Sequence, residues 1–240
     1  MLTPANKPNS VTHMSSALSK LTHLQPCCGI PGVLDVQQDR SYLARNVFIE
    51  AGMVALNSRR FDDLHIADIA EAAGQSVGGF YSRFEDKEAF FRALCATTVE
   101  NCNAIVAERM APEALSRMSV EAGLETVVDL MTDLFTARWR GVLREALTRI
   151  LNPENPWEPM RDSARDIVRR INAGFAHRLQ VDEPEKTLRF CFQAIVGVLQ
   201  NDLVNDYHVY TTRDQSLRTA LKTMVIAYAT AESANRRSTR

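Results

Sequence analysis

Apolar residues recur at helical spacing along most of the chain from residue 40 onward. In the first segment they fall at i, i+3, i+4, i+7 and i+8 and line one side of a helix over about 40–57: Phe48, Ala51, Gly52, Ala55 and Leu56. A short second helix is expected over about 65–73, and a third of about two turns between Ser76 and Phe84. Longer helical patterns follow at about residues 86–110, 119–136, 138–151, 158–180, 184–206 and 213–233. No convincing strand pair or sequence repeat is present, so the predicted fold class is all-α.

Composition divides this pattern into three parts. Residues 1–37 are rich in Ser, Thr, Pro, Gly and Gln and show no sustained period. Such a segment cannot bury enough surface to offset the entropy of ordering, so we expect a mobile N-terminal tail. The short helices form a three-helix head at residues 38–95, and the longer ones form a larger C-terminal helical bundle at 96–240.

The formal net charge of the chain is only −1, which excludes a strongly basic protein that coats nucleic acid without specificity. No apolar run reaches the roughly 18 to 20 residues of a membrane helix, and no signal peptide is evident at the N-terminus. We therefore expect a cytoplasmic protein with no membrane partner.

The candidate chemistry is sparse. The five cysteines are odd in number and lack the paired spacing of a zinc site, so they are interpreted as free thiols: Cys27, Cys28, Cys95, Cys102 and Cys191. Cys95 and Cys102 fall at i and i+7 and could sense oxidants, or could simply be buried. No phosphate loop, nucleophile elbow or metal-spaced cluster occurs, so we expect no metal, no cofactor and no catalytic residues.

Residues 66–84 have the layout of a helix-turn-helix. Ala70 is small enough for two short helices to cross closely, and Gly74 can adopt the left-handed conformation that ends the first of them. Ser76 is placed to cap the next helix, with an apolar side expected to face the core: Val77, Phe80 and Phe84. The opposite side then carries small polar or hydrogen-bonding side chains, as in a recognition helix: Ser76, Gly79, Tyr81, Ser82 and Arg83.

At these residues, the stretch 45–95 resembles the N-terminal domain of the tetracycline-repressor (TetR) family of bacterial regulators. The matching positions are Asp68-Ile69-Ala70, Ala73-Gly74, Ser76, Gly78, Phe80-Tyr81, Phe84 and Asp86-Lys87-Glu88. The resemblance implies that the third helix enters the major groove of DNA and that Tyr81 and Lys87 hold phosphates. The alternative is that Tyr81 belongs to the core and Lys87 is a solvated charge.

The full set of predicted DNA contacts is Arg45, His65, Gln75, Ser76, Val77, Gly78, Gly79, Tyr81, Ser82, Arg83 and Lys87. Three positions depart from the family pattern. Arg60 stands at the usual glycine after the first helix, His65 replaces the usual threonine cap, and Gln75 replaces a hydrophobic turn residue.

For the C-terminal bundle, the resemblance implies a homodimer on a near-palindromic operator and a small hydrophobic effector that releases a repressor. Two apolar faces suit a four-helix dimer interface, one at Leu188, Cys191, Phe192, Ile195, Val198 and Leu199, the other at Leu217, Leu221, Met224, Val225 and Tyr228. The resemblance also implies an effector pocket, for which the candidate residues are Met131, Phe135, Trp139, Phe175 and Phe192, although the sequence alone favours ordinary core for each of them. The alternative function is a DNA-binding organiser or protein-interaction factor of the same fold that has no small-molecule effector.

Overall fold

The computed structural model describes residues 29–34, 39–152, 156–205 and 210–237, and the side chains of 39–41 and 231–237 are not described. Helices account for the described secondary structure apart from an isolated bridge between Val33 and Phe84, so the predicted all-α fold is confirmed. Cys27 and Cys28 lie outside the described residues. Within the described part, no helix is both long and apolar enough to cross a membrane.

The head consists of α2 (Asp39–Leu56), α3 (Ile66–Ala72) and α4 (Val77–Tyr81), which pack against the start of α5 (Lys87–Arg109). Its core is a cluster of four fully buried phenylalanines, Phe48, Phe80, Phe84 and Phe90. Their rings meet mostly edge to face, with centroids 5.0 to 6.3 Å apart, an arrangement that aromatic quadrupoles favour. These contacts fix α4 across α2 and α5.

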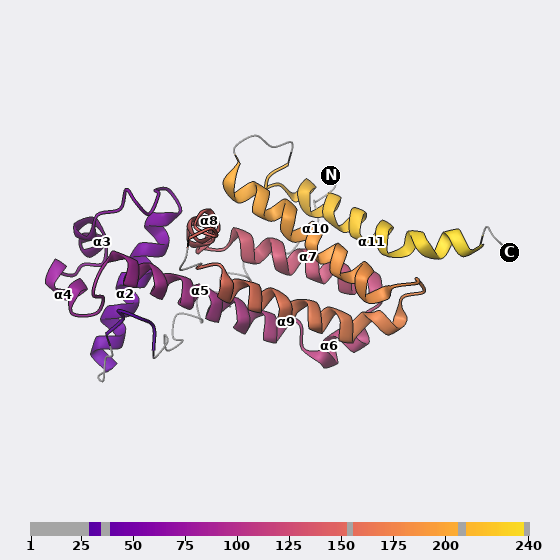
Figure 1. Ribbon diagram of the computed structural model, residues 1–240, viewed down its shortest axis with the longest axis horizontal. Coiled ribbons are helices and arrows are strands. Elements are labelled where there is room, and N and C mark those ends of the chain that lie inside the picture. The colour runs from indigo at the N-terminus through magenta and orange to yellow at the C-terminus, as the bar shows by residue number, and fades with distance from the viewer. Residues whose placement is uncertain (1–28, 35–38, 153–155, 206–209, 238–240) are drawn as a thin grey trace, which may run out of the picture.

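The body extends away from the head as a bundle of long helices (Figure 1). Its elements are α5, α6 (Pro112–Arg117), α7 (Val120–Thr136), α8 (Arg140–Thr148), α9 (Glu158–Phe175), a 3-10 turn η2 (Ala176–Arg178), α10 (Pro184–Val204) and α11 (Gln215–Arg237). In the bundle, α5 packs against α9, α7 packs against α11, and α10 contacts α7, α9 and α11. The short α8 lies where the bundle meets the head and packs against α2.

Two helix boundaries differ from the sequence prediction. The helix α6 was not expected, because Pro112 looks like a break in the pattern. The backbone N–H of the first helical residue has no partner within the helix. Proline, which lacks this N–H, can therefore start a helix, as Pro112 does here. The helix α9 ends at Phe175 and tightens into η2 over the next three residues, where a continuous helix to about residue 180 was predicted.

Residues 29–34, which the sequence pattern assigns to the tail, lie against the head. The backbone N–H of Leu34 donates to the carbonyl oxygen of Arg83 at 2.9 Å, and the N–H of Glu85 donates to that of Gly32 at 2.9 Å. Gly32 has φ +75°, and a Cβ there would lie 2.8 Å from that of Ala89. This short strap therefore requires a glycine at position 32 and begins the ordered head before α2.

Candidate nucleic-acid interface and effector chamber

The turn between α3 and α4 is built by local hydrogen bonds. Gly74 has φ +60°, a left-handed conformation that favours glycine, and the N–H of Gln75 donates to the carbonyl of Ala70 at 2.9 Å. Ser76 caps α4, since its Oγ accepts from the N–H of Gly79 at 3.0 Å. The turn and cap predicted from the sequence are therefore confirmed.

The two sides of α4 differ in burial. Phe80 and Phe84 are fully buried, whereas Ser76, Gly78 and Ser82 are exposed. The prediction that Val77 packs into the core is wrong, because 42% of its surface is exposed. It is the first residue of α4, and side chains tilt toward the N-terminus of a helix, so Val77 projects past the end of α4. Val77 thus joins the exposed side of the helix.

Tyr81 lies at the edge of this exposed side. Its ring meets that of Phe80 edge to face at 5.6 Å, and 49% of the residue is exposed. The hydroxyl has no hydrogen-bond partner among the described residues. Tyr81 is therefore not a core residue, and its hydroxyl is accessible to another molecule.

Two of the predicted cationic contacts, Arg83 and Lys87, form hydrogen bonds within the protein itself. The Nη1 of Arg83 donates to the carbonyl of Gly79 at 2.6 Å and to the Oγ of Ser82 at 2.8 Å. The Nζ of Lys87 donates to the carbonyl of Asp62 at 3.1 Å and lies 4.6 Å from the ring centroid of Phe61. These contacts place both cations beside α4 and the start of α5, where a phosphate could replace a weaker partner.

The remaining predicted contacts are placed differently. His65 and Gln75 are exposed at the start of α3 and in the turn, and His65 makes no side-chain cap. Gly79 is half-buried beneath Arg83. Arg45 corrects the prediction, because only 3% of its surface is exposed and its guanidinium lies 5.1 Å from the ring centroid of Tyr42. Arg45 is therefore buried in this structure and does not lie on the exposed side of the head.

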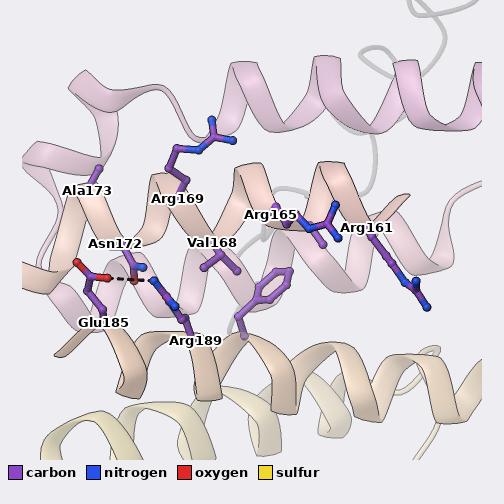
Figure 2. A pocket seen from close by; sticks show the side chains of 10 residues that line it. Arg161, Arg165, Val168, Arg169, Asn172, Ala173, Glu185 and Arg189 are labelled. Carbon is purple, nitrogen blue, oxygen red and sulfur yellow. Dashed lines mark hydrogen bonds and ion pairs between the residues drawn. The ribbon is translucent and has the colours of Figure 1, made fainter. Parts of the chain in front are cut away.

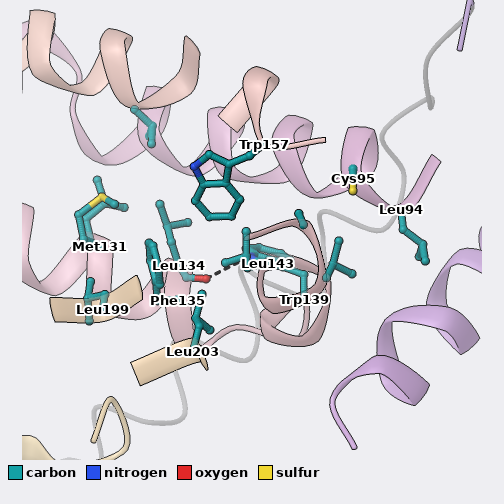
Figure 3. Packing of buried hydrophobic residues seen from close by; sticks show 14 of the residues in the cluster. Leu94, Cys95, Met131, Leu134, Phe135, Trp139, Leu143, Trp157, Leu199 and Leu203 are labelled. Carbon is teal, nitrogen blue, oxygen red and sulfur yellow. Dashed lines mark hydrogen bonds between the residues drawn. The ribbon is translucent and has the colours of Figure 1, made fainter. Parts of the chain in front are cut away.

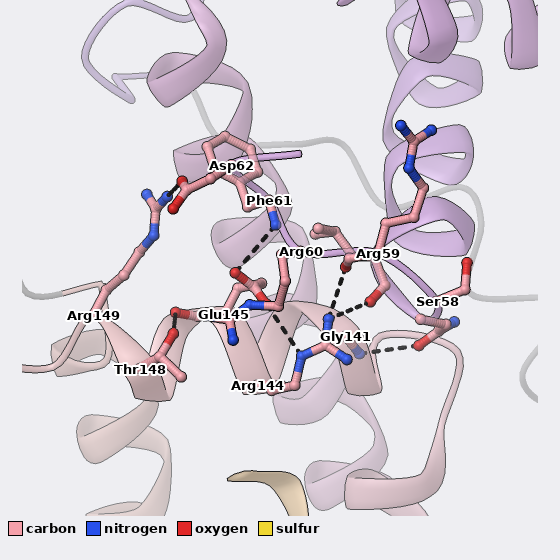
Figure 4. Close-up of polar contacts among 12 residues, drawn as sticks. Ser58, Arg59, Arg60, Phe61, Asp62, Gly141, Arg144, Glu145, Thr148 and Arg149 are labelled. Carbon is pink, nitrogen blue, oxygen red and sulfur yellow. Dashed lines mark hydrogen bonds and ion pairs between the residues drawn. The ribbon is translucent and has the colours of Figure 1, made fainter. Parts of the chain in front are cut away.

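A buried carboxylate joins the head to the body (Figure 4). Glu145 of α8 is 2% exposed and accepts from the backbone N–H of Phe61 at 3.2 Å. The Nε of Arg60 lies 3.0 Å, and the Nε of Arg144 3.1 Å, from its Oε1. Arg60, a departure from the family pattern, is therefore a partner of the body.

Backbone groups at the end of α2 are also bonded to the body. Arg144 donates through Nη2 to the carbonyl oxygens of Leu56 at 2.9 Å and Arg59 at 2.8 Å. The side chain of Asn57 accepts from the N–H of Gly141 at 3.0 Å and donates to the carbonyl of Arg138 at 2.7 Å. Because α2 carbonyls at a helix end need partners, these bonds tie the position of α8 to that of the head.

Inside the body lies a mostly apolar chamber of about 360 Å³, within the usual range for ligand pockets. It is enclosed by side chains from α5, α7, α8, α9 and α10 and from the segments next to α8 and α9. Met131 and Phe135 line it, as predicted, together with Trp157, Met160 and Ile167, which were not predicted. The signal for these three was the apolar spacing of i, i+3 and i+10 along one side of α9.

Three predicted pocket residues do not line this chamber: Trp139, Phe175 and Phe192. Figure 3 shows Trp139 among the buried side chains of the body. Trp139 is fully buried and donates through Nε1 to the carbonyl of Leu134 at 2.9 Å. Phe175 packs on Gly123, where a Cβ would lie 2.1 Å from its ring. Phe192 lines a separate groove between α9 and α10. The first two are ordinary core because neighbouring helices fill the space around them.

Burial keeps the described cysteines protonated. It raises the pKa of Cys95 and of Cys102 to about 12, and the pKa of Cys191 to about 11. Since the thiolate is the reactive form, these thiols are poor nucleophiles at neutral pH. Cys95 is buried as expected for a spectator, whereas Cys102 is half-buried and lines the chamber.

One face of α10 and α11 exposes large apolar side chains. Phe190 and Tyr228 are about half exposed, and their ring centroids are 4.8 Å apart. Val198 and Met224 are also exposed. Most of the predicted interface residues are instead buried inside the subunit: Leu188, Cys191, Phe192, Ile195, Leu199, Leu217, Leu221 and Val225. The exposed apolar surface is thus narrower than the sequence suggested.

Comparison with known proteins gave one family match. Residues 43–94 match the family described as bacterial regulatory proteins, tetR family, which confirms the resemblance seen in the sequence. This segment contains α3, α4 and most of α2. A comparison with curated protein sequences gave no significant match.

Several solved structures share the fold. A protein assigned to the TetR family of transcriptional regulators from Mesorhizobium loti MAFF303099 is 20% identical, with a TM-score of 0.63 over 81% of this chain and 98% of its own. One from a Rhodococcus species is 16% identical, with a TM-score of 0.56 over 79% and 98%. A transcriptional regulator from Streptomyces coelicolor A3(2) is 15% identical, with a TM-score of 0.56 over 78% and 98%. At these identities the likeness shows the fold.

Proposed function

Because residues 43–94 match the tetR family of bacterial regulatory proteins, and the whole chain has the fold of solved regulators, we propose that this protein is a sequence-specific DNA-binding transcriptional regulator and not an enzyme. The observation that carries the proposal is the division of α4 into two sides. Phe80 and Phe84 anchor it, while Ser76, Val77 and Tyr81 face outward. A helix anchored in this way can insert its exposed side into the major groove while its buried side stays packed in the core of the head.

In this proposal, α4 presents its small exposed residues to base edges and its flank to phosphates. The accessible hydroxyl of Tyr81 donates to a phosphate oxygen. Lys87 lies at the N-terminus of α5, where free N–H groups and the helix dipole favour an anion. A phosphate there outcompetes the neutral carbonyl of Asp62 as its partner, because charge-assisted hydrogen bonds are stronger.

The regulator acts as a homodimer. The helix α4 has only five residues, so one copy reads too few bases for specificity. The exposed apolar surface of α10 and α11, which includes Phe190 and Tyr228, pairs with the same surface of a second copy. The two α4 helices then lie about 34–36 Å apart, one turn of DNA, and bind a near-palindromic operator.

The chamber in the body takes a small effector that releases the repressor from DNA. Leu143 of α8 lines the chamber, and Glu145 of the same helix accepts from the N–H of Phe61 in the head. A ligand that displaces α8 therefore also disturbs the bonds between α8 and the head. The ligand shifts the equilibrium only as far as its affinities for the two positions of α8 differ.

Selection from a random duplex library tests the proposal, followed by titration of the selected DNA against protein variants. Tyr81→Phe should weaken binding by about 0.5–1.5 kcal/mol, similarly across related sites, with unchanged melting. Phe84→Ala should instead lower stability by roughly 3–5 kcal/mol through a cavity in the head. The proposal fails if no palindromic site is enriched, or if folded Tyr81→Phe binds DNA as the parent protein does.

The effector is tested separately by thermal shift. A bound compound stabilises the folded state, so it raises the melting temperature, and the same compound should release the selected DNA. Compounds that stabilise the protein without release from DNA would contradict the role of the chamber in regulation but leave DNA binding intact.

A further inference from the structure

A groove on the surface between α9 and α10 lies next to the apolar chamber. Two residues of α9, Arg161 and Ala164, line both spaces. The groove has a volume of about 800 Å³. It is lined by Arg161, Ala164, Arg165, Val168, Arg169, Asn172, Ala173, Glu185, Arg189 and Phe192. A ligand can therefore have one part in the chamber and another in the groove.

We propose that the effector is an amphipathic anion, whose apolar part fills the chamber and whose carboxylate or phosphate lies in the groove beside Arg161. This inference rests on the proposed function, since it names the chemical class of the effector. It differs from the sequence prediction of a purely hydrophobic ligand.

The side chains of the groove carry more positive than negative charge. Four arginines line it, with Glu185 as the single carboxylate among the lining residues. Arg161, Arg165 and Arg169 follow one another at intervals of four residues and span about 12 Å along α9. In Figure 2 the side chain of Arg169 points away from α10, whereas that of Arg161 points toward the α10 side. Arg189 lines the groove from α10. Each of the four arginines also pairs with a carboxylate close to it on the same helix: Glu158, Asp162, Asp166 or Glu185.

Arg161 is well placed to bind this anion. Its Nη1 contacts the Oε2 of Glu158 at 2.8 Å, and this is its one ion pair among the described residues. Guanidinium has five N–H donors in a planar fork, so a carboxylate or phosphate can bind without loss of that pair. Its side chain is 44% exposed, which leaves the donors accessible from the groove.

The polar groups of the chamber support the same orientation. Of its walls, those from α7 and α8 are apolar, at Met131, Leu134, Phe135 and Leu143. Arg161, Ser163 and Gln200 lie on α9 and α10, the two helices that border the groove. Thr98 of α5 also lines the chamber, but its hydroxyl donates to the carbonyl of Leu94 at 2.8 Å. The polar end of a ligand therefore meets the remaining polar side chains on α9 and α10.

Decanoate and its neutral counterpart decanol provide a direct test. Trp157 lines the chamber, and the only other tryptophan, Trp139, is buried nearby, so ligand binding can be followed by tryptophan fluorescence in the full-length protein. At pH 7.5 decanoate should bind about tenfold more tightly than decanol, because it gains a charge-assisted contact. Release of selected DNA should follow the same order.

Matched variants locate the contact. Arg161→Gln should abolish the preference for decanoate, and Arg161→Lys should keep part of it. Arg117→Gln removes an exposed charge from α6, outside both spaces, and should leave the preference unchanged. Ala164→Phe narrows the passage and should weaken both ligands.

Equal binding of decanol and decanoate would overturn the anionic class while leaving a purely apolar effector, and hence the proposed function, intact. An unchanged preference in Arg161→Gln would overturn the assigned site. Failure of both probes to bind a protein that still binds its selected DNA would also overturn the inference, but not the DNA-binding function.

Discussion

Gly141, the second residue of α8, lies directly against Leu56, the last residue of α2. A Cβ at position 141 would be 2.1 Å from the carbonyl oxygen of Leu56 and 2.7 Å from the backbone nitrogen of Asn57. Real Cβ atoms do not approach other atoms so closely, and backbone cannot rotate away as a flexible side chain can. The contact between body and head therefore requires glycine at this position.

Gly141→Ala should push α8 away from the end of α2. We expect a loss of about 1–3 kcal/mol in the free energy of unfolding, as for other substitutions that overpack a core, and a change in DNA affinity. Urea denaturation and DNA titration measure the two effects. Gly78→Ala is the stability control, because its Cβ would meet only the Oγ of Ser76 at 3.9 Å. Equal stability of the two variants would contradict a tight contact at Gly141.

Glu145→Gln keeps the shape of the buried side chain and removes its charge. The new amide oxygen can still accept from Phe61, but Arg60 and Arg144 lose their carboxylate. Since hydrogen bonds to charged groups contribute about 1.5–3 kcal/mol, and Arg60 is more than half exposed, we expect a loss near the lower end of that range.

The control for this substitution is Glu183→Gln, which breaks an exposed pair with Lys186 and should cost about 0.5 kcal/mol or less. Thermal melts of both variants at low and high salt distinguish the buried carboxylate of Glu145 from the exposed ion pair of Glu183. If Glu145→Gln melts no lower than Glu183→Gln, the buried carboxylate does not hold the head.

Arg83→Ala should distinguish a base contact from a phosphate contact. If Arg83 contacts guanine, the variant should lose about 1–3 kcal/mol of the preference for guanine at one position of the operator. If Arg83 binds a phosphate, the slope of log K against log salt concentration should become shallower by about one. Titrations at several salt concentrations across operator variants measure both. Arg117→Ala, on the body, should change neither the base preference nor the salt dependence. If the titrations of Arg83→Ala equal those of the parent protein, Arg83 does not contact DNA.

Phe190→Glu should convert the proposed dimer into a folded monomer, because it places a charge in the exposed apolar surface beside Tyr228. Analytical ultracentrifugation measures the assembly, and circular dichroism checks the fold. Leu151→Glu is the matched control, since Leu151 is 94% exposed and lies outside α10 and α11. A Phe190→Glu protein that remains dimeric would place the interface elsewhere.

The buried thiols should make the protein sensitive to alkali. Because burial raises the pKa of Cys95 and Cys102 to about 12, their contribution to stability is complete below the unfolded pKa and is lost as pH rises toward 12. Above about pH 8.5, we expect a loss on the order of 1 kcal/mol per pH unit for each thiol. The difference in melting temperature between pH 7.5 and pH 10.5 should be smaller in Cys95→Ala/Cys102→Ala than in the parent. An equal difference would contradict these shifts.

Local chemistry made the head predictable from its sequence. Gly74 and Ser76 define the turn and cap through bonds to residues at most five positions away, and Phe80 and Phe84 face inward because of their spacing. The helices of the body were also predicted closely, since their apolar period and prolines are local signals. Pro112 misled the prediction because proline both interrupts helices and starts them.

The sequence by itself thus determined the helices, the turn of the head and the resemblance of residues 43–94 to a regulator family. Only the tertiary structure decided which apolar residues line a cavity and which fill the core, because helical periodicity shows which side of a helix faces inward but not what lies opposite it. Phe135 of α7 lines the chamber, whereas Phe175 of α9 packs on Gly123. The tertiary structure also brought Glu145 to Phe61, 84 positions away. A charged residue in an amphipathic helix shows no local sign that a distant backbone N–H will be its partner.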